Sequence, residues 1–205
     1  QDPLNPRDEG GYAESGYSHD GHVVTYSGPD GDHVGKEIFI GSNESEVVII
    51  DITDKSNPNF ISSVSYSNHS YVHQGWFDKN QHYLFVGDEL DELNFGYQTR
   101  TIVFDLSDLD NPIFHFEYLG STNAIDHNGY VKDDIYYLAG YTSGVRMIDI
   151  SNVGSKNITE IGYFDTYTLN DDTSFNGVWS VYPFFDSGNI IVSDINTGLY
   201  IIKKK

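Results

Sequence analysis

A short pattern centred on a histidine recurs along the chain and constrains its fold more than any other feature. The pattern surrounds His19, His73 and His127, and each step between these histidines is 54 residues. A fourth version, 49 residues further on, has Asn176 in place of the histidine. Recurrence at this period predicts one structural unit copied four times.

Two further patterns follow the same repeat. An apolar run that ends in aspartate occurs at 47–51, 102–105 and 145–149, and the run at 198–202 begins like the one at 144–148. The pattern Asp-x-x-Asn-Pro occurs at 2–6, 54–58 and 108–112. Proline prevents the preceding strand from continuing, so this second pattern predicts a turn between strands.

Each unit is predicted to contain short strands separated by polar or Gly-rich turns. The predicted strands are 22–26, 37–41, 47–52 and 60–66; 75–77, 83–87, 101–106 and 113–118; 129–131, 135–139, 145–150 and 159–164; and 178–182, 189–193 and 199–202. Four antiparallel strands at this period are typical of one β-propeller blade. The predicted fold is therefore an all-β propeller, a single domain over 1–205 with blades at about 17–66, 71–118, 125–166 and 175–202.

The fourth unit has only three predicted strands, which leaves two interpretations of how the blades would close into the circular arrangement of a propeller. A candidate N-terminal strand at 7–14, centred on Glu9 to Ala13, would complete the last blade and close the ring. Closure would hide the strand edges that otherwise favour aggregation. Alternatively, the chain is the C-terminal part of a larger propeller that an N-terminal half or a partner chain completes.

Charge and composition exclude several classes of partner. The chain has 11 Lys and Arg against 31 Asp and Glu, a net charge of −20, which argues against nucleic acid as a partner. No run of 18 apolar residues is present, so direct membrane insertion is not expected. The chain has no Cys, and the acidic surface suits either solubility or cation binding.

Several longer motifs resemble those of the choice-of-anchor B proteins, which are built from LVIVD repeats. These motifs are 17–21, 35–44, 51–55, 73–76, 88–92, 99–101, 124–128, 175–183 and 192–199. The resemblance covers nearly the whole chain. It implies a propeller fold and an extracellular or cell-surface bacterial protein, and it implies no established catalytic activity.

The three repeated histidines, together with Asn176 at the fourth repeat position, are the first candidate site. Each lies just before the innermost strand of its unit, a position that faces the central channel of a propeller or its mouth. A channel or ligand site is predicted at His19, His73, His127, Asn176, Trp76 and Trp179. Three imidazoles and an amide, with Asp20 or Asp126 as a nearby carboxylate, would suit a transition metal. The alternative is a structural set of histidines that tie loops together.

The acidic segment 88–92 is the second candidate site. It contains four carboxylates in five residues, which suits calcium, and Asp88 and Glu89 are the metal candidates here. The alternative is a solvated acidic loop paired with Arg100. The loop tyrosines Tyr71, Tyr97 and Tyr141 are candidate contacts for carbohydrate or protein.

These observations favour a secreted or cell-surface binding or scaffolding module, with a protein or carbohydrate partner at its loop face or channel mouth. One alternative is a metal-dependent or glycosidase-like hydrolase with its site at the channel mouth, and Asp20, Asp88, Glu89 and Asp126 are the nearest acid candidates. Another is a structural subunit of an extracellular assembly. Histidines outside the repeat are expected to be ordinary surface residues: His22, His33, His69, His82 and His115.

Overall fold

The computed structural model describes residues 2–204, which form an all-β chain of four antiparallel sheets. The first sheet contains β1 (Asp20–Thr25), β2 (Glu37–Ser42), β3 (Val47–Asp51) and β4 (Asn59–Val64). The second contains β5 (Val72–Phe77), β6 (Tyr83–Asp88), β7 (Arg100–Asp105) and β8 (Ile113–Leu119). The third contains β9 (Gly129–Lys132), β10 (Ile135–Ala139), β11 (Val145–Asn152) and β12 (Asn157–Phe164). The fourth has three strands, β13 (Val178–Tyr182), β14 (Asn189–Asp194) and β15 (Gly198–Lys203).

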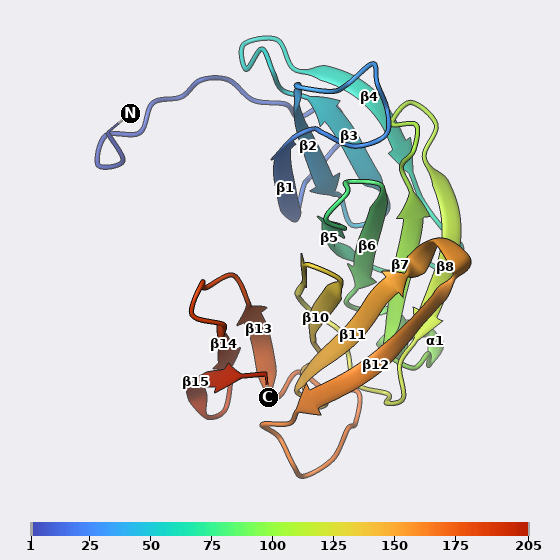
Figure 1. Ribbon diagram of the computed structural model, residues 1–205, viewed down its shortest axis with the longest axis vertical. Coiled ribbons are helices and arrows are strands. Elements are labelled where there is room, and N and C mark those ends of the chain that lie inside the picture. Colours follow the sequence, from blue (N-terminus) through green and yellow to red (C-terminus); the bar gives the residue numbers. More distant parts are fainter. Residues whose placement is uncertain (1, 205) are drawn as a thin grey trace.

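The sheets follow one another along an arc, as Figure 1 shows. Within each sheet the strands pair in chain order, so each sheet is an antiparallel meander. The first strands of successive sheets also contact one another, β1 with β5, β5 with β9 and β9 with β13. These first strands therefore form the inner side of the arc, and the residues at their N-terminal ends come together.

Apolar strands explain why the sheets stack face to face. Strand β3 is buried from Val47 to Ile50, since it lies inside its own sheet. One buried cluster joins Ile38 and Ile49 of the first sheet to Val72 and Phe104 of the second. A similar cluster joins the second sheet to the third, and another joins the third to the fourth. Every predicted strand in the four units is present, with bounds that differ by a few residues at most.

The prediction of an N-terminal strand at 7–14 is not met. Within residues 2–204 this segment forms no strand, and β15 pairs with β14 alone. The segment instead lies over the first sheet, where Tyr12 lines the same hollow as Phe39 and Ile50. The segment contains two glycines and little alternation of apolar residues, so it has no apolar strand face to bury. The half-buried ring of Tyr12 is instead stabilised by its contact with apolar side chains. The sheets formed by residues 2–204 do not close into a ring, and the first and last sheets lie at the two ends of the arc (Figure 1).

A short helix, α1 (Asp91–Phe95), was not predicted. It lies between β6 and β7 and ends at Gly96, whose φ of 74° is left-handed, as is common for glycine after a helix. No helix in residues 2–204 has the length and apolar character needed to cross a membrane.

Candidate functional site

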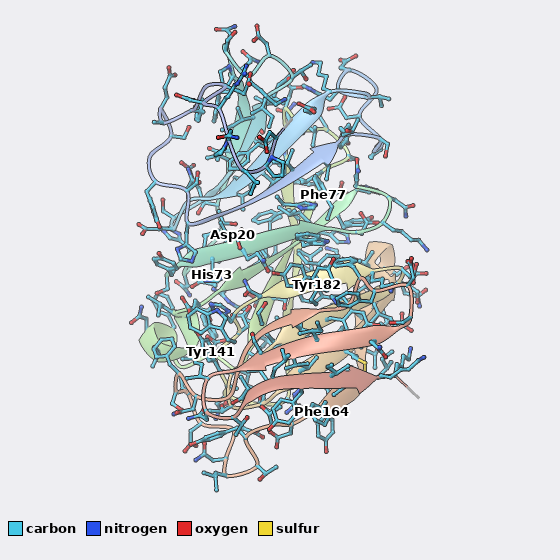
Figure 2. The ribbon with its side chains drawn as sticks, turned by 90° about the vertical axis from the view of Figure 1, so that its left-hand side faces the viewer. Asp20, His73, Phe77, Tyr141, Phe164 and Tyr182 are labelled. Carbon is cyan, nitrogen blue, oxygen red and sulfur yellow. The ribbon has the colours of Figure 1, made fainter. Side chains whose placement is uncertain are left out.

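The repeated histidines come together at one end of the inner strands. His19 precedes β1, His73 lies in β5 and His127 precedes β9. The ring centres of His19 and His73 are 4.4 Å apart, and those of His73 and His127 are 4.3 Å apart. Figure 2 shows His73 and Tyr141 toward one end of the molecule's inner strands and Phe77 and Tyr182 toward the other. The prediction that the repeat gathers these imidazoles is therefore met by the geometry.

The fourth place in this row belongs to Trp179 rather than to Asn176. The Trp179 ring centre is 4.3 Å from that of His127. Asn176 instead accepts a hydrogen bond from Asn196 and donates one to Ser174. The shorter repeat step before Asn176 places this amide in a turn, so it does not replace a fourth imidazole.

Trp76 also lies outside the row of histidines, further along β5. Its ring packs against His22 at 3.8 Å and against Tyr130 at 4.9 Å. Trp76 lies three residues beyond His73, past a bulge in β5 between Val72 and Gln74, and its ring contacts different residues of the neighbouring repeats. Trp76 therefore belongs to an aromatic cluster between inner strands, separate from the histidine site.

Three side chains of this region are arranged as a metal centre would require. One ligand atom from each of His73, Glu89 and His127 lies within 4.8 Å of the other two. The Nε2 atoms of His73 and His127 are each 3.7 Å from an oxygen of Glu89. This distance is too long for a hydrogen bond, whereas two ligands at about 2.0–2.2 Å from one zinc ion are roughly 3.3–3.6 Å apart. The group is called the His–Glu–His cluster below.

The protonation of His127 follows from its neighbour. Its Nδ1 lies at hydrogen-bond distance from the backbone carbonyl of Trp179, which can only accept. Nδ1 must therefore carry the proton, and the Nε2 lone pair faces Glu89. Such an orienting bond to the second ring nitrogen is usual for histidines that bind metals.

Burial keeps the two imidazoles of the cluster neutral. Desolvation, with the neighbouring His127 and His19 rings as smaller causes, lowers the pKa of His73 to about 3. Desolvation also lowers the pKa of His127, although the Glu89 charge opposes this. Both rings are thus neutral at pH 7, which is the form that binds a metal ion.

Glu89 is held in place from the third sheet. The Tyr141 hydroxyl donates to Glu89 Oε1 at 2.7 Å, and Tyr141 is fully buried. The prediction of Tyr141 as an exposed partner contact is therefore wrong. His19 is exposed and pairs through Nδ1 with the Tyr71 hydroxyl at 3.0 Å, so it borders the cluster without belonging to it.

Asp88 has a structural role. Its two oxygens accept bonds from the Tyr66 hydroxyl and from the amides of Ser70, Tyr71 and Leu90. Asp194 occupies the corresponding place in the last sheet, where Thr166 and Thr197 donate to it. A carboxylate already saturated with donors has little capacity left for a metal ion, so Asp88 lies outside the cluster although it was a metal candidate.

The rest of the acidic segment is buried rather than solvated, contrary to one of the two interpretations of the sequence. Asp91 and Glu92 are 0% and 3% exposed, and Arg100 Nε donates to Asp91 at 2.6 Å. Asp126 is 1% exposed and lies on the segment before β9. Burial is the main cause that raises the pKa values of Asp91, Glu92 and Asp126, and the charges of neighbouring carboxylates add to it. A carboxyl as deeply enclosed as that of Asp126 cannot contact a sugar, so Asp126 does not suit the acid role predicted for it.

Two histidines outside the repeat are not ordinary surface residues. His33 is 7% exposed and its Nε2 lies 3.0 Å from Asp110, while Lys36 lies 3.4 Å from Nδ1. This arrangement ties the loop after β1 to the turn after β7. His22 is half-buried against Trp76, and desolvation lowers its pKa to about 4.

The depressed pKa of His22 makes a prediction about acid stability. The folded state keeps His22 neutral to about pH 4, whereas the unfolded chain binds the proton near pH 6.5, so stability is lost as the pH falls through this interval. The substitution His22→Phe keeps the stacking on Trp76 and removes the titration. We expect the loss of unfolding free energy between pH 7 and 4.5 to be smaller by about 1–2 kcal/mol in this variant, by urea unfolding. The exposed His69, replaced by glutamine, is the control, and an unchanged pH dependence in H22F would contradict the prediction.

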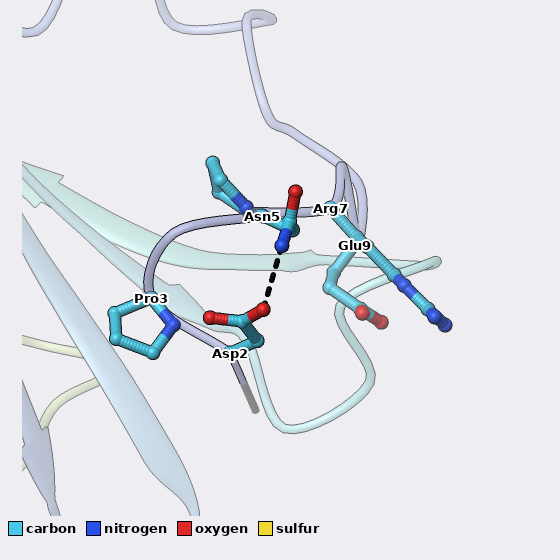
Figure 3. Close-up of a pocket in the computed structure, with 6 residues that line it drawn as sticks. Asp2, Pro3, Asn5, Arg7 and Glu9 are labelled. Carbon is cyan, nitrogen blue, oxygen red and sulfur yellow. Dashed lines mark hydrogen bonds between the residues drawn. The ribbon is translucent and has the colours of Figure 1, made fainter.

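A separate hollow lies in the N-terminal segment, as Figure 3 shows. Asp2 and Asn5 are joined across it by a hydrogen bond of 2.6 Å. Its lining consists of Asp2, Pro3, Asn5, Pro6, Arg7 and Glu9. No residue of the His–Glu–His cluster lines this hollow, so it is not part of the candidate site.

Comparison with solved structures supports the fold. The chain is similar to a β-propeller domain. That domain belongs to Myceliophteria thermophila Cps50 (Swd1), with 12% identity, a TM-score of 0.55, and coverage of 91% of this chain and 52% of that one. A protein from Lactobacillus plantarum matches at 16% identity and a TM-score of 0.59, over 81% of this chain and 53% of its own. The chain thus spans about half the length of these structures. No family model and no curated protein matches the sequence.

Proposed function

We propose that the chain is part of a β-propeller that acts as a binding module and holds a divalent transition metal at the His–Glu–His cluster. The similarity to a propeller domain supports the first part of this proposal, that the chain belongs to a β-propeller. The stacking of successive sheets through their inner strands agrees with it. The second part, that the chain binds a metal ion, rests on the geometry of the cluster itself.

One observation carries the metal assignment. The Nε2 lone pair of His127 and an oxygen of Glu89 face each other at 3.7 Å in a site where His73 and His127 are 3% and 5% exposed. Two unprotonated acceptors repel each other at this distance unless a cation lies between them. Nitrogen and carboxylate donors together suit zinc and similar ions better than calcium, which takes oxygen ligands.

The cellular location and the binding partner of the protein are also proposals. The resemblance to choice-of-anchor B proteins favours a secreted or cell-surface protein, and a net charge of −20 suits solubility there. A protein or carbohydrate partner would then contact the loop end where His19 and Tyr71 are accessible beside the cluster. We propose that the metal fixes the geometry of these loops.

Titration with Zn²⁺ tests the proposal. The chain is first freed of metal with a chelator, and binding is followed by calorimetry. We expect one tight site, and we expect Glu89→Gln and His127→Asn each to weaken it at least about 100-fold, since even the loss of an outer-shell partner costs about 10–100-fold. His69→Gln, which changes an exposed histidine that does not belong to the cluster, is the matched control.

The variant Glu89→Gln keeps the side-chain shape, so a loss of binding in a folded E89Q chain cannot be attributed to unfolding. Circular dichroism and the melting temperature of each variant are measured in parallel. If the wild-type chain binds no Zn²⁺, or if E89Q binds it as tightly as wild type, the metal assignment is refuted.

A metal-dependent hydrolase is a second candidate because the cluster has only three protein ligands. Catalytic zinc sites typically combine three protein ligands with a water molecule in the fourth position. Hydrolysis of activated esters and phosphoesters by the zinc-loaded chain, lost in E89Q, would favour this candidate. Zinc binding without such turnover would leave the binding module as the function.

A further inference from the structure

Two of the ligands in the His–Glu–His cluster are held in place by residues that contact the fourth sheet. His73 and Glu89 belong to the second repeat and His127 belongs to the third. The Trp179 carbonyl accepts from His127 Nδ1, and the Tyr141 hydroxyl donates to Glu89 Oε1. Trp179 is itself part of β13, the first strand of the fourth sheet. The cluster therefore depends on the position of a sheet that provides none of its ligands.

Tyr141, which lies between β10 and β11, contacts the fourth sheet through its backbone. It forms an isolated antiparallel bridge with Val178, whose amide donates to the Tyr141 carbonyl at 3.0 Å. The approach is close, because a Cβ on Gly177 would lie 2.4 Å from the same carbonyl oxygen. Tyr141 is 0% exposed and has a φ of 33°, a left-handed conformation that a residue other than glycine keeps only where its surroundings hold it. Tyr141 thus positions Glu89 with its side chain and contacts β13 with its backbone.

Within residues 2–204, the fourth sheet is packed against one neighbouring sheet only. One buried cluster joins it to the third sheet, whereas the second and third sheets are each packed on both faces. Its other face exposes Leu199 and Ile201, whose exposed fractions are 64% and 66%. Units with few buried apolar contacts open more readily than the rest of a fold. We therefore expect the fourth sheet to detach from the third more easily than the inner sheets separate from each other.

We propose that metal binding at the His–Glu–His cluster is coupled to the docking of the fourth sheet, so that the ion and the sheet hold each other in place. This inference rests on the metal site proposed above. With the sheet docked, the Trp179 carbonyl keeps the proton on His127 Nδ1 and leaves the Nε2 lone pair for the ion. When β13 moves away, His127 loses this acceptor, and loss of the bond from Val178 frees the segment that carries Tyr141.

The size of the coupling follows from the bonds that orient the ligands. Such bonds are worth about 10–100-fold in metal affinity. Because coupling between two binding equilibria is reciprocal, a bound ion favours the docked sheet by the same factor by which docking favours the ion. The fourth sheet is thus the element through which the metal affinity of the protein is regulated.

Hydrogen exchange, measured by mass spectrometry on the full chain, tests the coupling. Zn²⁺ is added to the chelator-treated protein at about 100 times the dissociation constant found by calorimetry. We expect amide exchange in segment 189–203, which covers β14 and β15, to slow at least about tenfold, although this segment contains no ligand. Segment 37–64, which covers β2 to β4 of the first sheet, is the control and should slow less than about twofold. In Glu89→Gln, zinc should change the exchange of neither segment.

Two glycine variants separate the position of the fourth sheet from its general stability. Gly177 and Gly198 have positive φ values of 86° and 97°, so alanine strains the backbone at either position. An alanine Cβ at Gly177 meets the Tyr141 carbonyl, whereas one at Gly198 meets no atom within 4 Å. We expect Gly177→Ala to weaken zinc binding about tenfold or more and Gly198→Ala to leave the affinity within about twofold. Tyr141→Phe, which keeps the ring and removes the hydroxyl, should also bind zinc at least about tenfold more weakly.

The outcomes distinguish failure of the coupling from failure of the proposed metal site. If the wild-type chain binds no Zn²⁺, the metal site and the coupling are both refuted. If zinc binds and E89Q abolishes the binding, but segment 189–203 exchanges as fast as without zinc, the metal site stands and the coupling is wrong. Equal zinc affinities in G177A and G198A, both shown to be folded by circular dichroism, would also refute the coupling.

Discussion

Replacing Arg100 with methionine is expected to lower the free energy of unfolding by about 3–5 kcal/mol, because loss of one partner of a buried ion pair leaves the other charge unpaired. Arg100 is 2% exposed and its partner Asp91 is 0% exposed. The guanidinium also donates to the backbone carbonyl of Asn68 at 2.8 Å and lies 4.4 Å from the centre of the Tyr97 ring. Methionine fills much of the same space and removes all of these interactions. Urea unfolding at pH 7 with a chelator present measures the change.

Arg146 provides the matched control for this prediction. It also pairs with a glutamate, Glu160 at 3.3 Å, and lies 4.7 Å from the centre of the Tyr163 ring. Its side chain is 12% exposed and Glu160 is 26% exposed, so water screens the pair. We expect Arg146→Met to cost about 1 kcal/mol. Equal losses in R100M and R146M would show that the buried carboxylates do not depend on Arg100.

The strands were predictable from the sequence because their apolar patterns are local. The run at 47–51 is apolar until its aspartate, and the structure buries the four apolar residues of β3 there. The turn after it was predictable from Asp54 and Pro58, and the Asn57 amide bonds to the Asp54 carbonyl at 3.0 Å. Pairing in chain order then follows from short connections, which favour antiparallel neighbours.

The burial of the acidic segment was not predictable in the same way. Four carboxylates in five residues normally indicate an exposed loop. Asp91 and Glu92 are enclosed because residues from other elements approach them. Arg100 lies 9 residues after Asp91 in the sequence, and Asp126 lies 34 residues after Glu92. Such contacts depend on how two sheets pack, and no local pattern records that packing.

The candidate site was predictable as far as the repeat extends. Equal steps placed His73 and His127 at equivalent positions, and Glu89 was a metal candidate from its acidic segment alone. The sequence did not indicate that Glu89 and the two histidines would share one centre, because Glu89 has no counterpart in the histidine pattern. It did indicate Trp179 as a channel residue, but it gave the position next to His127 to Asn176, because the shorter last repeat step hides which side chain lies there.

Replacing Gly129 with alanine is expected to destabilise the chain by about 3 kcal/mol, which tests the packing that positions His127. Gly129 lies two residues after His127 at the start of β9, and its amide donates to Gln74. A Cβ there would lie 1.9 Å from the hydroxyl oxygen of Tyr136, which is 2% exposed and has no room to move aside. Overpacking of this kind typically costs about 1–3 kcal/mol or more.

Gly75 is the natural control because it lies two residues after His73 in the preceding repeat. A Cβ on Gly75 would be 3.5 Å from its nearest neighbour in Leu84, an ordinary contact. Gly75→Ala should therefore change the unfolding free energy by less than about 1 kcal/mol, with stabilisation expected because alanine restricts the unfolded chain. Opposite signs for two glycines at one repeat position would show that backbone contact with Tyr136, rather than the repeat pattern itself, requires glycine beside His127. Similar losses in G75A and G129A, measured by urea unfolding, would contradict this account.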